Sequence, residues 1–276
     1  MASVEIIILL ASGYYSVKFF LRWYRFLLTG TQIRRSAFAR AVLCILPAPA
    51  FLIIIFTLIT LASFDVVSST EYILLYLLIG LWWLRIGISL MFFFFDLSWV
   101  DDAINMDNPA AALAIFGGGL GVTLIYAGAN IGDGPGWWCV FFAGGLGLAA
   151  FIVLGVLVNA VAKIFRSITV NHDVCCGIRT CAWFLASGII LGRASAGDWT
   201  SFSKTVLEFG DCWPVLILTA GFILFELFFA SAGRPEDHDN NAVRYLLTTV
   251  LGIVYIAFSV YAVYFLPPLP VNPIYG

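Results

Sequence analysis

Eight long apolar segments separated by short polar stretches limit most strongly what this chain can fold into. They lie at about 4–28, 42–64, 72–98, 110–131, 138–161, 175–195, 213–232 and 245–266. An α-helix needs about 20 apolar residues to cross the hydrocarbon core of a bilayer. The composition agrees, because 62% of the residues are hydrophobic and only 11% are charged, unlike soluble domains. We therefore predict an all-α polytopic membrane helical bundle in which 1–276 forms a single transmembrane domain.

Basic residues indicate the orientation, because Lys and Arg are retained on the cytoplasmic side of a membrane. With eight crossings, Lys204 is the only basic residue in a loop on one side, and ten fall on the other: Arg22, Arg25, Arg34, Arg35, Arg40, Lys163, Arg166, Arg179, Arg234 and Arg244. We therefore predict that both termini lie outside. The inner loops are then at about 29–41, 99–109, 162–174 and 233–244.

Two stretches 65 residues apart in the sequence resemble each other. One begins at 108–113 and ends at Gly132-Asp133, and the other begins at 173–178 and ends at Gly197-Asp198. Related openings occur at 241–244 and, more faintly, at 35–42. Every copy begins at an inner loop and runs outward. This pattern predicts four parallel two-helix hairpins, at about 1–64, 72–131, 138–196 and 213–266, rather than the inverted repeats of many transporters.

Small residues are concentrated in the fourth and fifth crossings. They let helix backbones approach closely in lipid, where the hydrophobic drive for association is absent. A phosphate-binding glycine loop is excluded, because these glycines lie within apolar helices and lack the Lys and Ser/Thr of such a loop. We expect packing roles for Ala110, Ala111, Ala112, Gly117, Gly118, Gly119, Gly121, Gly144, Gly145, Gly147 and Gly155.

The opening at 108–112, its glycine-rich helix and the stretch 186–192 resemble a family of bacterial inner-membrane proteins catalogued as domain of unknown function 350. The resemblance covers about residues 72–198. It implies a location in the bacterial inner membrane and a four-helix plan of two hairpins, but no activity, cofactor or site residue. The sequence departs from the family where Asp173 replaces the expected Asn and where further hairpins flank both ends.

Two charged residues lie well inside apolar segments, where an ionisable group costs roughly 2.5–3.5 kcal/mol on insertion scales. Arg85 is near the centre of the third crossing, and Glu226 lies in the seventh, closer to its inner end. We predict that they form a structural ion pair if Arg85 bridges this difference in depth. A role in a pathway or gate, or a ligand or lipid contact, remains an alternative for each.

Three basic residues of the first crossing, Lys18, Arg22 and Arg25, share one helical face because their spacing is i, i+4 and i+7. Such a face at the inner surface is suited to anionic lipid headgroups. Determination of topology alone is the alternative explanation. Both interpretations place these residues toward the inner leaflet.

Asx residues precede the outward helices, and we expect Asn108, Asp173 and Asn241 to cap them by accepting backbone N–H bonds. The alternative is that acidic inner loops converge into a mouth that attracts cations, as charged rings do in channels.

The sequence contains no pattern typical of catalysis. It has two histidines, His172 and His238, no HExxH motif and no nucleophile elbow. We interpret the six cysteines as small packing residues and expect neither a metal site nor a cofactor. A net charge of −2 gives no basis for nucleic-acid binding. The cysteines are Cys44, Cys139, Cys175, Cys176, Cys181 and Cys212.

The function predicted from these observations is a non-enzymatic membrane scaffold or accessory subunit, whose helices pack against other membrane subunits or further copies of the chain. Its content of 25 Phe and 9 Trp offers large lipid- or protein-facing surfaces. The alternative is a small ion channel or permeation unit with a pore between the parallel hairpins.

Overall fold

The computed structural model describes residues 3–29, 37–231 and 241–275. Within these ranges the chain is helical, apart from turns and two isolated β-bridges that join Ala62 to Ile131 and Gly132. Eight helices or broken helices are long and apolar enough to cross a membrane. The prediction of an all-α polytopic membrane bundle is thereby confirmed.

The helices that form the first four crossings are α1 (Ser3–Thr29), α2 with α3 (Ala37–Ile45 and Pro47–Thr60), α5 (Thr70–Phe95) and α6 (Pro109–Ala129). The last four are α7 (Trp137–Ala162), α9 (Val174–Ala194), α11 (Pro214–Ser231) and α12 (Asn241–Phe265). A length of 27 residues makes α1 about 40 Å long at 1.5 Å per residue, which is enough to span the bilayer.

The expected loops are largely short helices. At one end of the bundle lie the π-helical η1 (Trp99–Asn105) and α8 (Ile164–Thr169), and at the other lie α4 (Phe64–Val67), α10 (Phe202–Glu208) and the 3-10 helix η2 (Phe209–Cys212). We call the end with η1 and α8 the basic end, and the end with α4 and α10 the terminal end. These helices are too short for the hydrophobic periodicity that identifies a helix in a sequence.

Prolines interrupt two crossings. Pro47 begins α3 directly after α2, and Pro214 begins α11 directly after η2. Proline has no N–H to donate to the preceding turn and its ring crowds that turn, so a helix bends or ends there. Helix is present on both sides of each proline, so the second candidate span starts at Ala37 rather than at 42, and the seventh extends back to Phe202.

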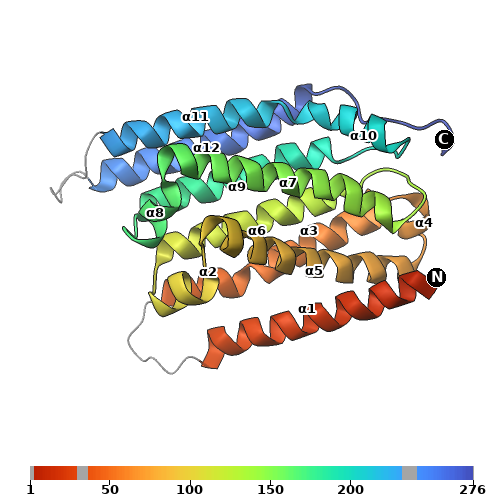
Figure 1. Ribbon diagram of the computed structural model, residues 1–276, viewed down its shortest axis with the longest axis horizontal. Coiled ribbons are helices and arrows are strands. Elements are labelled where there is room, and N and C mark those ends of the chain that lie inside the picture. The colour runs from red at the N-terminus through yellow and green to blue at the C-terminus, as the bar shows by residue number, and fades with distance from the viewer. Residues whose placement is uncertain (1–2, 30–36, 232–240, 276) are drawn as a thin grey trace.

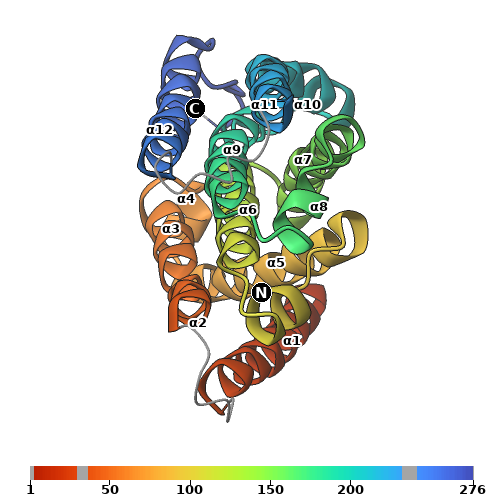
Figure 2. The same cartoon turned by 90° about the vertical axis from the view of Figure 1, so that its left-hand side faces the viewer.

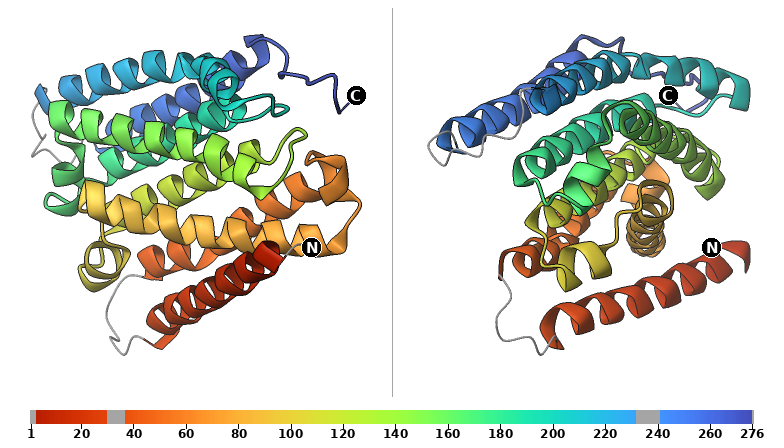
Figure 3. Two further views of the ribbon diagram at one scale, coloured as in Figure 1. Left: turned by 45° about the vertical axis from the view of Figure 1, so that its right-hand side comes forward. Right: turned by 60° about the vertical axis from the view of Figure 1, so that its left-hand side comes forward.

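The crossings form two curved rows. α1, α5, α7 and α11 follow one another in the first row, and α2 with α3, α6, α9 and α12 follow one another in the second (Figure 1; Figure 2). Each helix of the second row runs from the basic end to the terminal end. α1 and α12 lie at opposite edges of the array (Figure 3), so the helices form an open array in the part of the chain that the structure describes.

α6 and α9 form the centre of the molecule and pack parallel to each other along their whole length. A Cβ atom at Gly128 would lie only 2.0 Å from the carbonyl oxygen of Gly192, and one at Gly177 would lie 2.6 Å from Cα of Ala110. The two backbones therefore touch, as expected for small residues in a membrane. Gly145 departs from the expected packing role, because no atom lies within 4 Å of a Cβ placed there.

Candidate functional site

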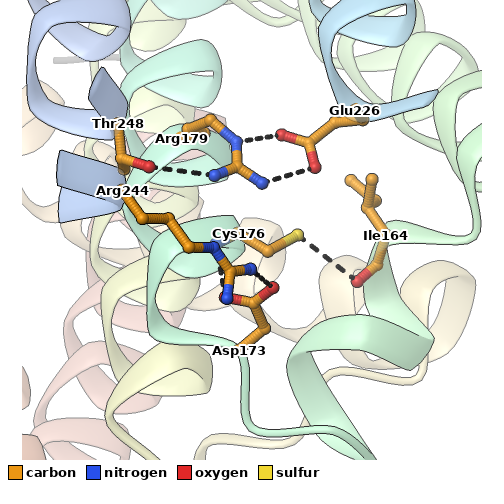
Figure 4. A network of polar contacts seen from close by, with 7 residues as sticks. All are labelled: Ile164, Asp173, Cys176, Arg179, Glu226, Arg244 and Thr248. Carbon is orange, nitrogen blue, oxygen red and sulfur yellow. Dashed lines mark hydrogen bonds and ion pairs between the residues drawn. The ribbon is translucent and has the colours of Figure 1, made fainter. Parts of the chain in front are cut away.

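A buried network of charged and hydroxyl groups joins α9, α11 and α12 near the basic end (Figure 4). Arg179 donates from Nε to Oε1 of Glu226 at 2.5 Å and from Nη2 to Oε2 of the same carboxylate at 2.8 Å. Its remaining nitrogen, Nη1, donates to Oγ1 of Thr248 at 3.0 Å. This two-point contact between guanidinium and carboxylate is the geometry in which Arg pairs most strongly.

Both charged side chains of this network are buried inside the protein. The Arg179 side chain is 1% exposed, and the Glu226 side chain is 6% exposed. Burial of either charge alone would be strongly unfavourable, whereas the pair is neutral and satisfies its hydrogen bonds internally. The network therefore fixes α11 and α12 to α9.

Glu226 was expected to pair with Arg85, and that prediction is wrong. Arg85 lies on α5, where its guanidinium stands 5.1 Å from the ring centroid of Tyr15 on α1. Glu226 is bound instead by Arg179, which sequence analysis assigned only to the basic side of the membrane. A signal was present, because Arg179 lies one turn from Cys176 and from Trp183 on the face of α9 that is buried.

The caps expected at the starts of α6 and α9 are present. Asn108 Oδ1 accepts from the backbone nitrogens of Ala110 at 2.9 Å and Ala111 at 3.2 Å, and its Nδ2 donates to the carbonyl of Ile168 at 2.7 Å. Asp173 Oδ1 accepts from the backbone nitrogen of Cys176 at 3.2 Å. Each side chain therefore satisfies at least one backbone N–H group in the first turn of its helix.

Asp173 has a second contact that links it to α12. Its Oδ2 accepts from Nη2 of Arg244 at 2.6 Å, and both side chains are partly exposed. This ion pair lies beside the buried one (Figure 4). The cap expected at Asn241 involves a side chain outside the part that the structure describes, as do Arg34, Arg35, Arg234 and His238.

At the terminal end, successive loops are joined by carboxylates. Asp133 Oδ1 accepts from the backbone nitrogen of Phe64 at 3.1 Å, and Asp198 Oδ1 accepts from the backbone nitrogen of Asp133 at 2.7 Å. Asp198 Oδ2 also accepts from the backbone nitrogen of Asn272 at 2.9 Å. Sequence analysis identified the two aspartates only as ends of similar stretches, and the structure shows that they connect the loops that follow α3, α6, α9 and α12.

The stretches 65 residues apart have matching geometry. α6 and α9 are each 21 residues long, and their caps, Asn108 and Asp173, are 65 residues apart. Asp107 and His172, which precede these caps, have φ angles of 50° and 53°. Beyond the helices, Gly132 and Gly197 have φ angles of 105° and 128°, which an L-residue with a side chain rarely adopts.

The three basic residues of α1 do not act as one cluster. Arg22 and Arg85 line a groove of about 510 Å³ beside η1, whereas Arg25 lines a separate apolar groove of about 530 Å³ between α1 and α5. The amine of Lys18 donates to Tyr14 Oη at 3.4 Å. The structure thus brings Arg22 together with Arg85, which sequence analysis placed in different groups.

The cysteines are free thiols within the described ranges. Cys176 is buried and directs its thiol toward the carbonyl of Ile164, with Sγ and O 3.9 Å apart. Among residues 3–29, 37–231 and 241–275, no group of three or more His, Cys, Asp and Glu side chains is placed to hold a metal ion.

Comparisons with protein-family models, with curated proteins and with solved structures found no match to this chain. The resemblance to the family of domain of unknown function 350 therefore stays a prediction. What the geometry itself establishes is a multi-pass membrane protein with a closely packed centre and internally paired buried charges.

Proposed function

We propose that this protein is a non-enzymatic integral membrane scaffold or accessory subunit, built from four parallel copies of one hairpin. The observation that carries the proposal is the close packing and charge pairing at the centre of the molecule. The backbones of α6 and α9 touch there, and the buried Arg179 and Glu226 neutralise each other between helices. These contacts hold the helices together, and the buried charges of Arg179 and Glu226 are used for this structural pairing.

The outer helices are the surfaces that such a framework presents to lipid and to partners. In the most apolar 18-residue stretch of α6, 83% is buried inside the protein, whereas the corresponding shares are 11% for α1 and 22% for α12. Large apolar side chains such as Leu10 and Tyr264 are exposed on these two edge helices. Partner subunits or a second copy of the chain would therefore attach along the edges of the row.

The open row gives less support to a permeation unit. A pore within one chain requires the hairpins to surround a shared axis lined by polar groups. Here α1 and α12 lie at opposite edges, and α6 packs directly on α9 at the centre of the array (Figure 2). We therefore favour the scaffold over the channel.

The proposed setting is a bacterial inner membrane with both termini outside. The distribution of charge supports this orientation, because Arg40, Lys163, Arg166 and Arg244 gather at the basic end, which would face the cytoplasm. A membrane-impermeant maleimide added to intact cells should label Ser201→Cys at the terminal end and leave Asn171→Cys at the basic end unlabelled. Labelling of Asn171→Cys instead would reverse the orientation.

Photo-crosslinking in cells tests the scaffold itself. A photoreactive amino acid at Leu10 or Tyr264, 67% and 81% exposed, should give one discrete adduct with a defined membrane protein or a second copy of the chain. The same amino acid at Val153, 64% exposed on the outer side of α7, is the control for general lipid exposure. The scaffold is rejected if the edge positions behave like the control and yield lipid adducts alone.

Measurement of ion flux into liposomes distinguishes the scaffold from a permeation unit. Purified wild-type protein should give no flux above that of empty liposomes. A flux that changes on Arg85→Ala or Glu226→Ala would replace the scaffold by a permeation unit and identify residues near its path.

A further inference from the structure

A groove of about 510 Å³ opens between α1, α5 and the segment that leads into η1. Its apolar walls include Phe19, Ile88 and Phe92, and its polar groups include Arg22 and Arg85. Ser98 and Trp99 lie at its basic end. The groove therefore combines an apolar wall with two cations, and one of these lies deep along α5.

Arg85 is ten residues before the end of α5 at Phe95, about 15 Å along the helix axis. A guanidinium at that depth requires compensation from protein, water or lipid polar groups. The ring of Tyr15 supplies part of it, at 5.1 Å from the guanidinium carbon. In the described residues neither Arg85 nor Arg22 forms a salt bridge with a carboxylate.

One carboxylate, Asp101, lines the basic end of the groove, but in the described residues it pairs with neither guanidinium. Asp101 accepts from Ser98 Oγ at 3.0 Å and from Asn105 Nδ2 at 3.2 Å. Asp102 accepts from the backbone nitrogen of Ser98 at 2.6 Å, and burial raises the pKa of its carboxyl. The two guanidiniums consequently remain available to an anion that enters the groove from the membrane.

α1 is attached to the rest of the chain by a narrow contact. Its buried residues are Ser12, Ser16, Trp23 and Leu27, and the remainder of the helix is partly or fully exposed. Grooves on both sides of this contact separate α1 from α5. Such gaps within a membrane are filled by lipid chains, so an occupant of the cationic groove would also hold α1 in place.

We propose that this groove binds an anionic phospholipid. Its phosphate contacts Arg22 at the basic end, its ester oxygens reach toward Arg85, and an acyl chain lies along Phe19 and Phe92. Its lining has two guanidiniums against the single carboxylate of Asp101, and this net positive charge favours a lipid with net negative charge over a zwitterionic one. The inference is independent of the scaffold, because a channel of the same fold would have the same groove.

The test measures lipids that remain bound after mild detergent extraction of the full chain from membranes of mixed phosphatidylglycerol and phosphatidylcholine. Wild type should retain phosphatidylglycerol preferentially. Arg22→Gln should lower this retention about fivefold, the factor for loss of one arginine near a membrane surface, and Arg85→Gln should lower it as well. Lys18→Gln is the matched control, because it removes one charge from the same helix outside the groove, and it should retain lipid as wild type does.

A second measurement uses the unaltered protein and is independent of whether the variants fold. A photoactivatable phosphatidylglycerol should attach near Phe19, Phe92 and Trp99 rather than near Val17 and Leu81, which line the other groove. Excess inorganic phosphate should not compete. The proposal would be overturned if wild type retained both lipids equally, or if Lys18→Gln and Arg22→Gln lost lipid equally. Attachment at the other groove or displacement by phosphate would also overturn it.

Discussion

Glu226 neutralises the charge of Arg179, because the two side chains are both buried and meet at two points. Glu226→Gln should lower the free energy of unfolding by about 3–5 kcal/mol, since it leaves a buried guanidinium without its counter-charge. Thermal unfolding of the purified protein in detergent would measure this loss. Glu71→Gln, at an exposed position at the start of α5, is the control and should have little effect.

The double variant Arg179→Met with Glu226→Leu separates charge balance from loss of contacts. Replacing both members of a buried pair by apolar residues of similar size is often neutral, so the double variant should be more stable than Glu226→Gln alone. If the single variant unfolds like wild type, the pair does not stabilise the bundle.

Asn108 contributes at two places, because it caps α6 and also binds the carbonyl of Ile168 in the α8 segment. Asn108→Ala should cost about 1–3 kcal/mol, from the lost cap and the buried carbonyl left without a donor. Hydrogen exchange should then accelerate at the backbone amides of Ala110 and Ala111. Asp173→Asn retains an oxygen that can cap α9, so the amide of Cys176 should stay protected; equal acceleration at both helices would contradict these roles.

Single residues differ in how far the sequence alone predicts them. The caps at Asn108 and Asp173 depend on local chain geometry, so an Asx side chain directly before an apolar run was sufficient. The partner of Glu226 depends on how α9, α11 and α12 are placed together, and no local pattern gives that. Arg85 was suggested because it lies well inside an apolar segment, but in the structure it contacts Tyr15 of α1, whereas Arg179 faces α11.

Among the helices, the contact between α6 and α9 tolerates the least change. A Cβ atom at Gly128 would meet the backbone of Gly192, and backbone atoms cannot move aside as a flexible side chain can. Gly128→Ala should therefore force the helices apart and cost about 1–3 kcal/mol or more. Chemical denaturation in detergent micelles would measure the change.

Gly145→Ala is the matched control, because it makes the same change within α7 where nothing lies within 4 Å. It should be neutral or slightly stabilising, since Ala favours a helix more than Gly does. Equal effects of the two substitutions would mean that helix propensity, rather than close packing, governs these glycines.

The crossings were predictable as elements because each is a long apolar run, and the observed helices agree with the expected ranges to within a few residues at most ends. Their interruptions were not predicted, although Pro47 and Pro214 mark them. α8, α10 and η1 were missed because each has seven residues or fewer, too few for a periodic pattern.

For the whole molecule, the order of the hairpins follows from contacts between neighbours. α6 packs on α9 and α9 packs on α12, while the loop aspartates Asp133 and Asp198 join successive hairpins at the terminal end. The sequence predicted parallel hairpins of one direction, but both a row and a ring satisfy that pattern. The contacts between helices decide between them, and these are seen only in three dimensions.

Distances between spin labels in lipid nanodiscs test the open row most directly. Labels would be attached at Val4→Cys on α1, Leu74→Cys on α5 and Tyr264→Cys on α12, in a chain whose six native cysteines are replaced. The row predicts that the distance from Val4 to Tyr264 clearly exceeds the distance from Val4 to Leu74, because α1 and α12 are at opposite edges (Figure 3). Similar distances for the two pairs would indicate a closed ring of hairpins and contradict the account.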